Sequence, residues 1–300
     1  MNEIQKTEAM KPIDMMKSCI SAPSVQEQFK NALGEHKDAF VASLIDLFTG
    51  DKQLQLCKPG AIVAEALRAA TLRLPLNKAL GFAYIIVYNN NVKNADGSFT
   101  KVLTPTFVPG YRGYIQLAMR TGQYRTINAD YIYEGEMRKV SKLTGEIALD
   151  GEKKSDKIIG YFCYFELLNG FNKTLYVSVE DMANYALRYS PSFKGRNKPT
   201  AEALIKLAQE NHVSQQVGWL GNFNDMALKT VIRRLLSKYG YLSVEMQNAL
   251  SKDTEEHTET RDEIISNSVR QEITLDETQY TVVDEETGEI KEEEPAGPDY

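Results

Sequence analysis

The sequence is short of cysteine and of long apolar runs, and each shortage excludes a class of protein. Its 300 residues include three cysteines, Cys19, Cys57 and Cys163, without the paired spacing of a disulfide framework or a zinc site. No apolar run approaches the ~18 residues that a membrane-spanning helix needs. The first residues are polar and lack the apolar stretch of a secretory signal. These absences predict a cytoplasmic protein with reduced thiols and no membrane partner.

The sequence also lacks the motifs of common catalytic and nucleotide-binding sites. It has no P-loop, no dinucleotide-binding glycine motif and no motif of a zinc protease or a serine hydrolase. We therefore predict no cofactor, no nucleotide site and no enzymatic activity, while a dependence on Mg²⁺ stays open. The nearest approach to a metal-dependent nuclease is three acids that flank a predicted strand, Asp130, Glu134 and Glu136. Polar positions in a turn are the favoured interpretation of these acids, because no paired acidic motif accompanies them.

Charge is distributed unevenly along the chain. The 41 acidic and 35 basic side chains give a net charge of -6, but residues 251–300 hold 17 of the acids and only 4 of the bases. Residues 1–250 therefore hold 24 acids and 31 bases, a net of +7. A basic body suggests a polyanionic partner, and the acidic tail, poor in large apolar residues, is predicted to be disordered. The tail could compete for the basic body, dock a partner protein or only solvate the chain.

Local patterns predict an α+β fold. Helical spacing of apolar residues covers residues 13–50 and 60–73. Short runs of β-branched and aromatic residues indicate strands, and Asn169-Gly170 between two of them is a strong hairpin signal. Ser178 and Asp181 have the spacing of a capping box that starts a helix. The predicted strands lie within 82–88, 102–108, 124–135, 158–167 and 174–179, and the later helices within 113–122, 181–190, 200–212 and 222–239.

The segment NFNDMALKTVIRRLLSKYG (222–240) carries the clearest functional signal. At 100° per residue its apolar side chains fall on one face, and the other face carries Lys229, Arg233, Arg234 and Lys238 with no acid among them. A solvated face usually mixes charges, because acid–base pairs four residues apart stabilise a helix and like-charged pairs do not. Here two like-charged pairs occur at that spacing. The pattern therefore favours a phosphate-binding face over an ordinary solvated one.

A second signal lies in FVPGYRGYIQLAMRTGQYR (107–125). Two glycines bracket Tyr111 and Arg112, which places an aromatic ring and a guanidinium at the start of a predicted helix, where backbone N–H groups favour anions. Arg120 and Arg125 follow. Interleaved aromatic and arginine side chains suit single-stranded nucleic acid, whose bases stack while its phosphates pair with cations. Core packing is the alternative for the tyrosines.

A third signal is the cationic loop RYSPSFKGRNKP (188–199). It contains Arg188, Lys194, Arg196 and Lys198 and no acid. Such a loop could clamp a nucleic-acid strand, or it could only keep the protein soluble. Trp219, the sole tryptophan, is expected to anchor the structure, with base contact as the second possibility.

Three blocks of the sequence occur in order over about residues 60–245. They are LPLNKALGFAYIIVY, then FVPGYRGYIQLAMRTGQYRTINADYIYEGE, then W-x(6)-MALKTVIRRLLSKYG. Together they resemble the RecT family of phage and prophage single-strand annealing proteins, and the middle block is the most specific. The resemblance implies a small antiparallel sheet packed with helices. It also implies an ATP-independent protein that binds single-stranded DNA and anneals it to a complementary strand in homologous recombination.

The resemblance further implies an organisation and a set of partners. We expect a mainly helical region over 1–80 that makes oligomer contacts, a DNA-binding α+β core over 81–250 and an acidic tail over 251–300. The oligomer would be a ring or helical filament that holds DNA and an annealed duplex intermediate in a basic groove. A 5′–3′ exonuclease is the expected partner, with a host single-strand-binding protein as a further one, in the cytoplasm of a bacterial host.

Positions in this sequence can be matched to the family motifs one by one. The turn Gly110-Tyr111-Arg112-Gly113 and the helix residues Lys229, Arg233 and Arg234 match, and contact with DNA is our inference for each. Two alternatives stay open at this point. The protein could coat and protect single strands without annealing them, or, less favoured, it could be a metal-dependent nuclease.

Overall fold

Four helices form the first part of the protein, and three of them begin at a proline. The structure is a computed structural model that describes residues 11–93, 97–141, 143–193, 198–214, 216–244, 246–247 and 249–250; the acidic tail lies outside the described residues. Proline fits the first turn of a helix because its fixed φ is helical and its missing N–H would have no partner there. The helices are α1 (Pro12–Ser21), α2 (Pro23–Leu33), α3 (Lys37–Gly50) and α4 (Pro59–Thr71), with short 3₁₀ turns η1 (Gly34–His36) and η2 (Leu54–Leu56). The helical N-terminal region that the sequence predicts is confirmed.

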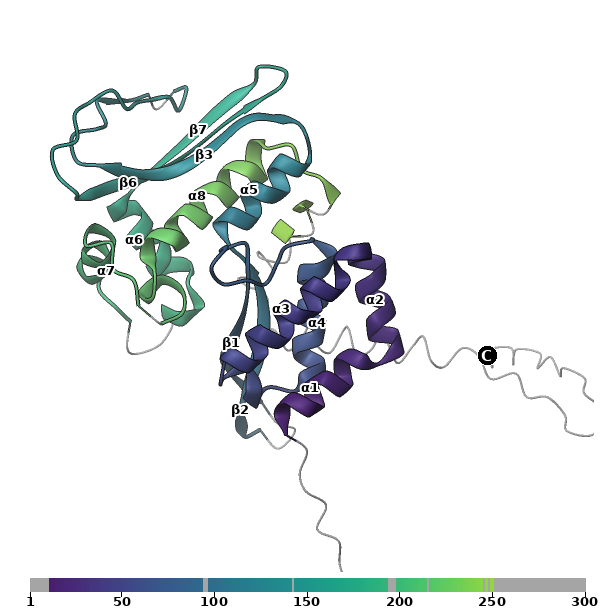
Figure 1. The fold of residues 1–300 in the computed structure, drawn as a ribbon. Helices are drawn as coiled ribbons and strands as arrows, with labels where there is room; N and C mark the ends of the chain where they lie inside the picture. Colours follow the sequence, from purple (N-terminus) through teal and green to yellow (C-terminus); the bar gives the residue numbers. More distant parts are fainter. Residues whose placement is uncertain are drawn as a thin grey trace, which may run out of the picture. The chain divides into compact units, whose positions relative to one another are not determined.

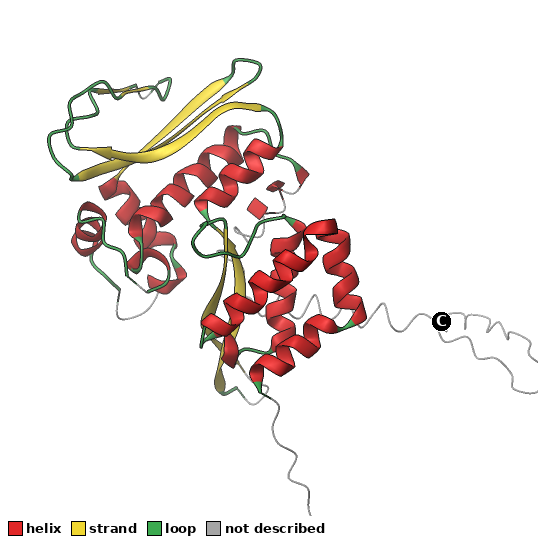
Figure 2. Ribbon diagram, in the orientation of Figure 1, coloured by secondary structure: helices red, strands yellow, loops and turns green. Residues whose placement is uncertain are grey.

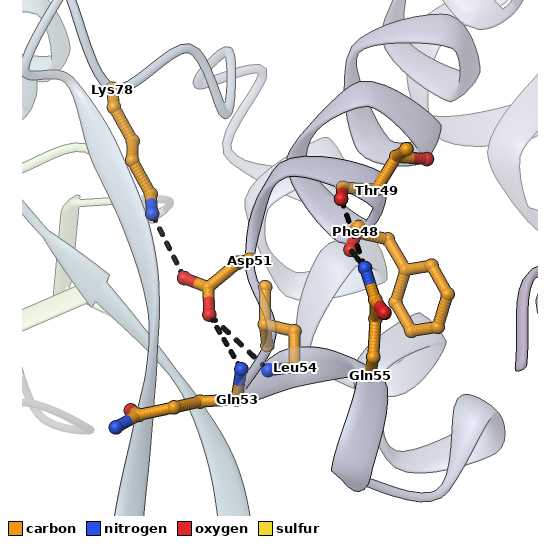
Figure 3. A network of polar contacts seen from close by, with 7 residues as sticks. All are labelled: Phe48, Thr49, Asp51, Gln53, Leu54, Gln55 and Lys78. Atoms are coloured by element: carbon orange, nitrogen blue, oxygen red, sulfur yellow. Dashed lines mark hydrogen bonds and ion pairs between the residues drawn. The ribbon is translucent and has the colours of Figure 1, made fainter.

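A polar network closes the end of α3 and ties it to the segment that precedes the first strand (Figure 3). The Nε2 of Gln55 donates to the carbonyl oxygens of Phe48 and Thr49 at 3.1 and 2.9 Å, which satisfies acceptors that a helix end leaves open. Asp51 accepts from the backbone of the next turn, and Lys78 Nζ donates to its Oδ2 at 2.9 Å. Burial alone would raise the pKa of Asp51, but the hydrogen bond and the charge of Lys78 outweigh burial, and the pKa lies below its ordinary value.

The strands form antiparallel sheets, as the resemblance implies. β1 (Ala83–Lys93) and β2 (Phe99–Pro109) make a two-stranded ribbon in which Ala83 pairs with Pro109 and Lys93 with Phe99. This ribbon is longer than the predicted strands 82–88 and 102–108, because pairing continues through the asparagines at 89–91. A three-stranded sheet has the order β3-β6-β7, and a short hairpin joins β4 to β5. Their bounds are β3 (Tyr124–Tyr133), β4 (Lys139–Val140), β5 (Ile147–Ala148), β6 (Ile158–Leu167) and β7 (Asn172–Ser178).

Two helices pack against one face of the three-stranded sheet (Figures 1 and 2). These are α5 (Tyr111–Arg120) and α8 (Phe223–Tyr239), and α8 contacts all three strands as well as α5. The remaining elements, α6 (Val179–Tyr189), η3 (Pro191–Phe193), α7 (Ala201–Gln209) and η4 (Gly218–Leu220), lie between β7 and α8 in the chain. Ser178 caps α6 by accepting from the Asp181 N–H at 3.0 Å, so the predicted capping box is confirmed. The predicted α+β class is confirmed too.

One continuous cluster of buried side chains joins the N-terminal helices to the sheet. It runs from Met16 in α1 to Leu250, beyond the end of α8. Trp219 in η4 is buried, and its ring lies 5.0 Å from that of Phe223 between centroids, which agrees with the anchoring role expected for it. The packing fixes α8 against the sheet, and the orientation of the basic side chains of α8 follows from it.

Candidate nucleic-acid interface

Three arginines and two tyrosines gather where α6 meets α8. We call this set the cation–tyrosine cluster: Tyr185, Arg188, Tyr189, Arg233 and Arg234. The two tyrosine rings lie 4.7 Å apart between centroids with a tilt of 43°. The guanidinium carbon of Arg188 is 5.4 Å from the centroid of Tyr189, and that of Arg234 is 5.6 Å from the centroid of Tyr185. Arg233 Nη2 donates to the Tyr185 hydroxyl at 3.5 Å.

The local helix geometry explains three of the five members of this cluster. Tyr185, Arg188 and Tyr189 are three and four residues apart, so they share one face of α6. The arginines of α8 come to the same place through tertiary packing, 48 residues along the chain from Tyr185 in the case of Arg233. A cation over the face of an aromatic ring is attracted by the ring quadrupole, which holds the guanidinium without neutralising its charge.

The cluster is open to solvent on its outer side. Arg188 and Arg234 are exposed, and 47% of Tyr189 is accessible. Within the part of the chain that the structure describes, neither Arg188 nor Arg234 forms an ion pair with a carboxylate; their contacts are with tyrosine rings. Two guanidinium groups therefore remain available for anions beside an exposed aromatic ring. The sequence indicated Arg188, Arg233 and Arg234, but it gave no sign of the two tyrosines beyond their spacing of four residues.

The basic face of α8 is less open than a helical wheel predicts. Lys229 is only 9% exposed and Arg233 is half-buried, whereas Arg234 and Lys238 are exposed. The wheel predicted an open position for Lys229, and this was wrong because α8 is surrounded by the sheet, α5 and α7 rather than packed on one side only. At the C-terminal end of α8, Lys238 Nζ lies 5.2 Å from the ring centroid of Tyr239.

The Gly-Tyr-Arg-Gly turn at the start of α5 is a place of close backbone contact. The Gly110 N–H donates to the carbonyl of Phe82 at 3.0 Å. A Cβ on Gly110 would overlap the carbonyl oxygen of Gly81, and one on Gly113 would overlap that of Phe82. The two glycines therefore let the segment around Gly81 and Phe82 pack backbone to backbone against the start of α5.

The turn does present an aromatic ring and a guanidinium, as the sequence predicted. Arg112 is exposed, its Nε donates to the Tyr111 hydroxyl at 3.1 Å, and its guanidinium carbon lies 5.6 Å from the Tyr111 ring centroid. The hydrogen bond and charge of Tyr111 raise the pKa of Arg112 further, so the guanidinium is fully charged.

An acid that sequence reasoning missed lies beside this turn. Asp225 occupies the first turn of α8, where its N–H donates to the capping Asn222 at 3.0 Å. Burial raises the pKa of Asp225, and the charge of Arg112 opposes the rise. Burial and the Asp225 carboxylate also raise the pKa of Tyr131 to about 12. An acid in a first helical turn is an ordinary sequence feature, so nothing in the sequence indicated that Asp225 faces Arg112.

We expect Asp225→Asn to stabilise the protein at neutral pH. The pKa of Asp225 is higher in the folded state than its ordinary 3.8, so ionisation of the carboxyl disfavours folding, and stability is lost as pH rises through the folded pKa. The variant should gain roughly 0.5 kcal/mol at pH 7, with a difference that shrinks as pH falls below 4. Urea denaturation at several pH values measures this, with the exposed Asp46→Asn as control. A constant difference at all pH values would contradict the account.

Two other predicted arginines have partners within the protein. Arg120 Nη1 and Nη2 donate to the carbonyls of Leu72 and Arg73 at 2.7 and 2.9 Å, which satisfies acceptors just after α4. Arg125 forms an ion pair with Glu166 across β3 and β6 at 2.8 Å. In the cationic loop, Lys198 is exposed, and Lys194 and Arg196 lie outside the described residues.

The three acids considered for a nuclease site each accept a hydrogen bond from another residue of the protein. Asp130 Oδ1 accepts from the Tyr131 N–H, Glu134 from the hydroxyl of Ser155 and Glu136 from the Tyr133 N–H. Among the residues that the structure describes, no three histidine, cysteine or acidic side chains are grouped so as to hold a metal ion. Nor does any helix in the same residues have both the length and the apolar character to span a membrane.

Comparison with known proteins gives the family. The model of the RecT family matches residues 38–266. The chain is 38% identical over 259 residues to "Uncharacterized protein YqaK" of Bacillus subtilis (strain 168), which covers 85% of this chain and 78% of that protein. It is 28% identical over 271 residues to "Protein RecT" of Escherichia coli (strain K12), a match that covers 85% of this chain and 87% of that protein. The chain belongs to the RecT family, as the resemblance indicated, and this membership supports a role in recombination by binding and annealing single-stranded DNA.

Proposed function

We propose that this protein anneals complementary single strands of DNA without ATP, as a homo-oligomer, in phage or prophage homologous recombination. The observation that carries the proposal is the cation–tyrosine cluster, in which exposed guanidinium groups flank an exposed aromatic ring. Family membership supports the recombination role. Binding of DNA and pairing of bases form no covalent bond, so the proposed function needs no catalytic group.

Arg188 and Arg234 would bind phosphates, and Tyr189 would stack on a base. Neutralising phosphates releases condensed counterions, which makes binding independent of sequence and sensitive to salt. Stacking on a tyrosine tolerates any base, because every base has a π-face. Because the Arg188 guanidinium carbon lies only 5.4 Å from the Tyr189 ring centroid, one nucleotide can contact both groups at once.

Other basic side chains would extend this surface. We assign DNA contact to Arg112 with Tyr111, to Arg233 and Lys238, and to the loop residues Lys194, Arg196 and Lys198. Lys229 would act from its buried position by adding positive potential under the surface. Arg120 and Arg125 were predicted as DNA contacts too, but their guanidinium groups are engaged with backbone carbonyls and with Glu166. We now assign these two a structural role.

Annealing would follow from how the strand is held. A strand bound along its phosphates, with base edges outward, lets a second strand test for pairing. An oligomer, whether ring or filament, keeps many nucleotides in register, so a long match stabilises the duplex intermediate and a few chance pairs do not. A 5′–3′ exonuclease that exposes the single strand is the fitting partner in the bacterial cytoplasm, together with the host single-strand-binding protein.

Binding of a labelled oligonucleotide tests the proposal. Fluorescence anisotropy should give similar affinities for oligothymidine and mixed sequence, and the logarithm of affinity should fall with that of salt concentration by about 0.7 per phosphate contact. Absence of binding at low salt would remove the proposal. Incubation with Mg²⁺ tests the nuclease alternative, for which shortened DNA is the required result.

A further inference from the structure

Large apolar side chains are exposed at the two opposite ends of α8. At its C-terminal end lie Leu168, Phe171, Tyr239 and Tyr241, which we call the aromatic end. Before its N-terminal end lie Val213, Val217 and Leu220, which we call the valine loop. Accessible fractions reach 56% for Leu168 and 65% for Val213. Scattered single apolar residues need no explanation, but grouped ones mark an interaction surface.

The aromatic end is one continuous surface assembled from three segments. The Leu168 N–H donates to the carbonyl of Gln123 at 2.9 Å, which joins the β6–β7 turn to the start of β3. The Tyr124 hydroxyl donates to the carbonyl of Tyr241 at 3.0 Å, which joins the same place to the end of α8. Figure 1 shows the β6–β7 turn and the last turn of α8 at the same end of the three-stranded sheet.

Two lysines border the aromatic end. Lys173 and Lys238 each place Nζ near the ring of Tyr239, at 5.5 and 5.2 Å from its centroid. Lys173 also donates to the carbonyl of Thr144 at 2.7 Å, so its position is fixed from both sides. The rim of this apolar surface is therefore positive.

The valine loop is held firmly although its apolar side chains point outward. Val213 bridges to Asn222, and the Ser214 N–H donates to the Gly221 carbonyl at 2.7 Å. Trp219 inside the loop is buried against Phe223. Glu210 precedes the loop and is exposed, with Lys206 at 3.8 Å as a loose partner. An exposed pair of this kind contributes little and is readily exchanged for another partner.

We propose that the aromatic end of one copy of this chain binds the valine loop of the next copy. Both surfaces are apolar at the centre, and their charged borders, Lys173 on one and Glu210 on the other, have opposite signs. The two surfaces differ from each other and lie at opposite ends of a 17-residue helix, about 25 Å apart. Such head-to-tail contacts repeat from copy to copy and produce a ring or filament rather than a closed dimer.

The arrangement has a consequence for the DNA surface. The cation–tyrosine cluster uses Arg233 and Arg234, which lie between the two ends of α8. Successive copies would then repeat the cluster at a regular interval along the assembly. This consequence rests on the proposed function, whereas the contact itself does not, because assembly can be measured without DNA.

Sedimentation velocity of the full chain without DNA tests the contact. Val217→Glu and Leu168→Glu each place a carboxylate in one of the two surfaces at an exposed position, so neither should prevent folding. Each variant alone should be monomeric at concentrations at which the unchanged protein forms large assemblies, a shift of at least tenfold in the assembly midpoint. Leu143→Glu is the matched control, since Leu143 is 93% exposed outside both surfaces and should leave assembly unchanged.

Mixing the two variants separates this contact from any other. Each retains the surface that the other has lost, so an equimolar mixture should form dimers that cannot grow. A mixture that stays monomeric, variants that assemble like the unchanged protein, or an unchanged protein that is monomeric throughout would each overturn the proposal. Binding of a short oligonucleotide by the monomeric variants should be normal, so a failure of DNA binding would be seen separately.

Discussion

Replacing Arg188 and Arg234 together by alanine should weaken binding of single-stranded DNA about 30-fold at low salt. Each guanidinium that contacts a phosphate contributes about 1 kcal/mol, and the two together about 2 kcal/mol. The dependence of affinity on salt should become shallower, by about 1.4 in the slope of the double-logarithmic plot, because two phosphate contacts are lost. Fluorescence anisotropy at four or five salt concentrations measures both quantities. Stability should change little, since both side chains are exposed.

A charge-matched control distinguishes this effect from loss of net charge. Arg138 and Lys139 are exposed, and they lie at the β4–β5 hairpin, outside the cation–tyrosine cluster. Their double alanine variant has the same net charge and should bind DNA almost normally. At Tyr189, the change to alanine should cost about 1–3 kcal/mol of DNA affinity, while the change to phenylalanine should keep stacking. Equal losses in the cluster variant and in the control would contradict the assigned site.

Replacing Asn224 by alanine should destabilise the protein by about 3–5 kcal/mol. Asn224 is buried in α8, and its Nδ2 donates to the carbonyl of Ala208 at 3.1 Å and to Asn211 Oδ1 at 2.8 Å. Its Oδ1 accepts from the hydroxyl of Tyr161, a fully buried side chain of β6. Alanine would leave the buried Tyr161 hydroxyl without its partner, at a cost of about 1–3 kcal/mol, and would remove two further hydrogen bonds of about 1 kcal/mol each.

Urea denaturation measures the loss, and two further variants calibrate it. Tyr161→Phe removes one hydroxyl and should cost about 1 kcal/mol. Asn184→Ala changes an exposed asparagine of α6 and should be neutral or slightly stabilising, because alanine favours helix. A loss for Asn224→Ala no larger than that for Tyr161→Phe would show that the network does not hold the sheet, α7 and α8 together.

Elements with local signals were predictable from the sequence. Ser178 starts α6 because its side chain reaches an N–H only three residues away, and Asn169-Gly170 turns the chain between β6 and β7. The amphipathic character of α8 also followed from spacing alone. In each of these cases the physical cause lies within a single helix or hairpin, so it can be predicted from residues that are near each other in the sequence.

The contacts and the burial that could not be predicted from the sequence depend on partners far away along the chain. Arg120 binds the carbonyl of Leu72, 48 residues earlier, and Arg125 pairs with Glu166, 41 residues later. Lys229 is buried because α5 and α7 cover a side of α8 that a wheel treats as open. The wheel assigns each residue an angle, but only the packed structure decides which angles face solvent. For the same reason the tyrosines that complete the cation–tyrosine cluster were not recognised.

The most direct test of the central claim is the rate at which two complementary oligonucleotides pair without ATP. One carries a fluorophore and the other a quencher, so pairing is followed as loss of fluorescence. The account predicts pairing faster than in protein-free buffer, an acceleration that disappears as salt rises and that the Arg188→Ala, Arg234→Ala variant largely loses. Tight binding with pairing slower than in buffer would contradict it and identify a protein that coats single strands.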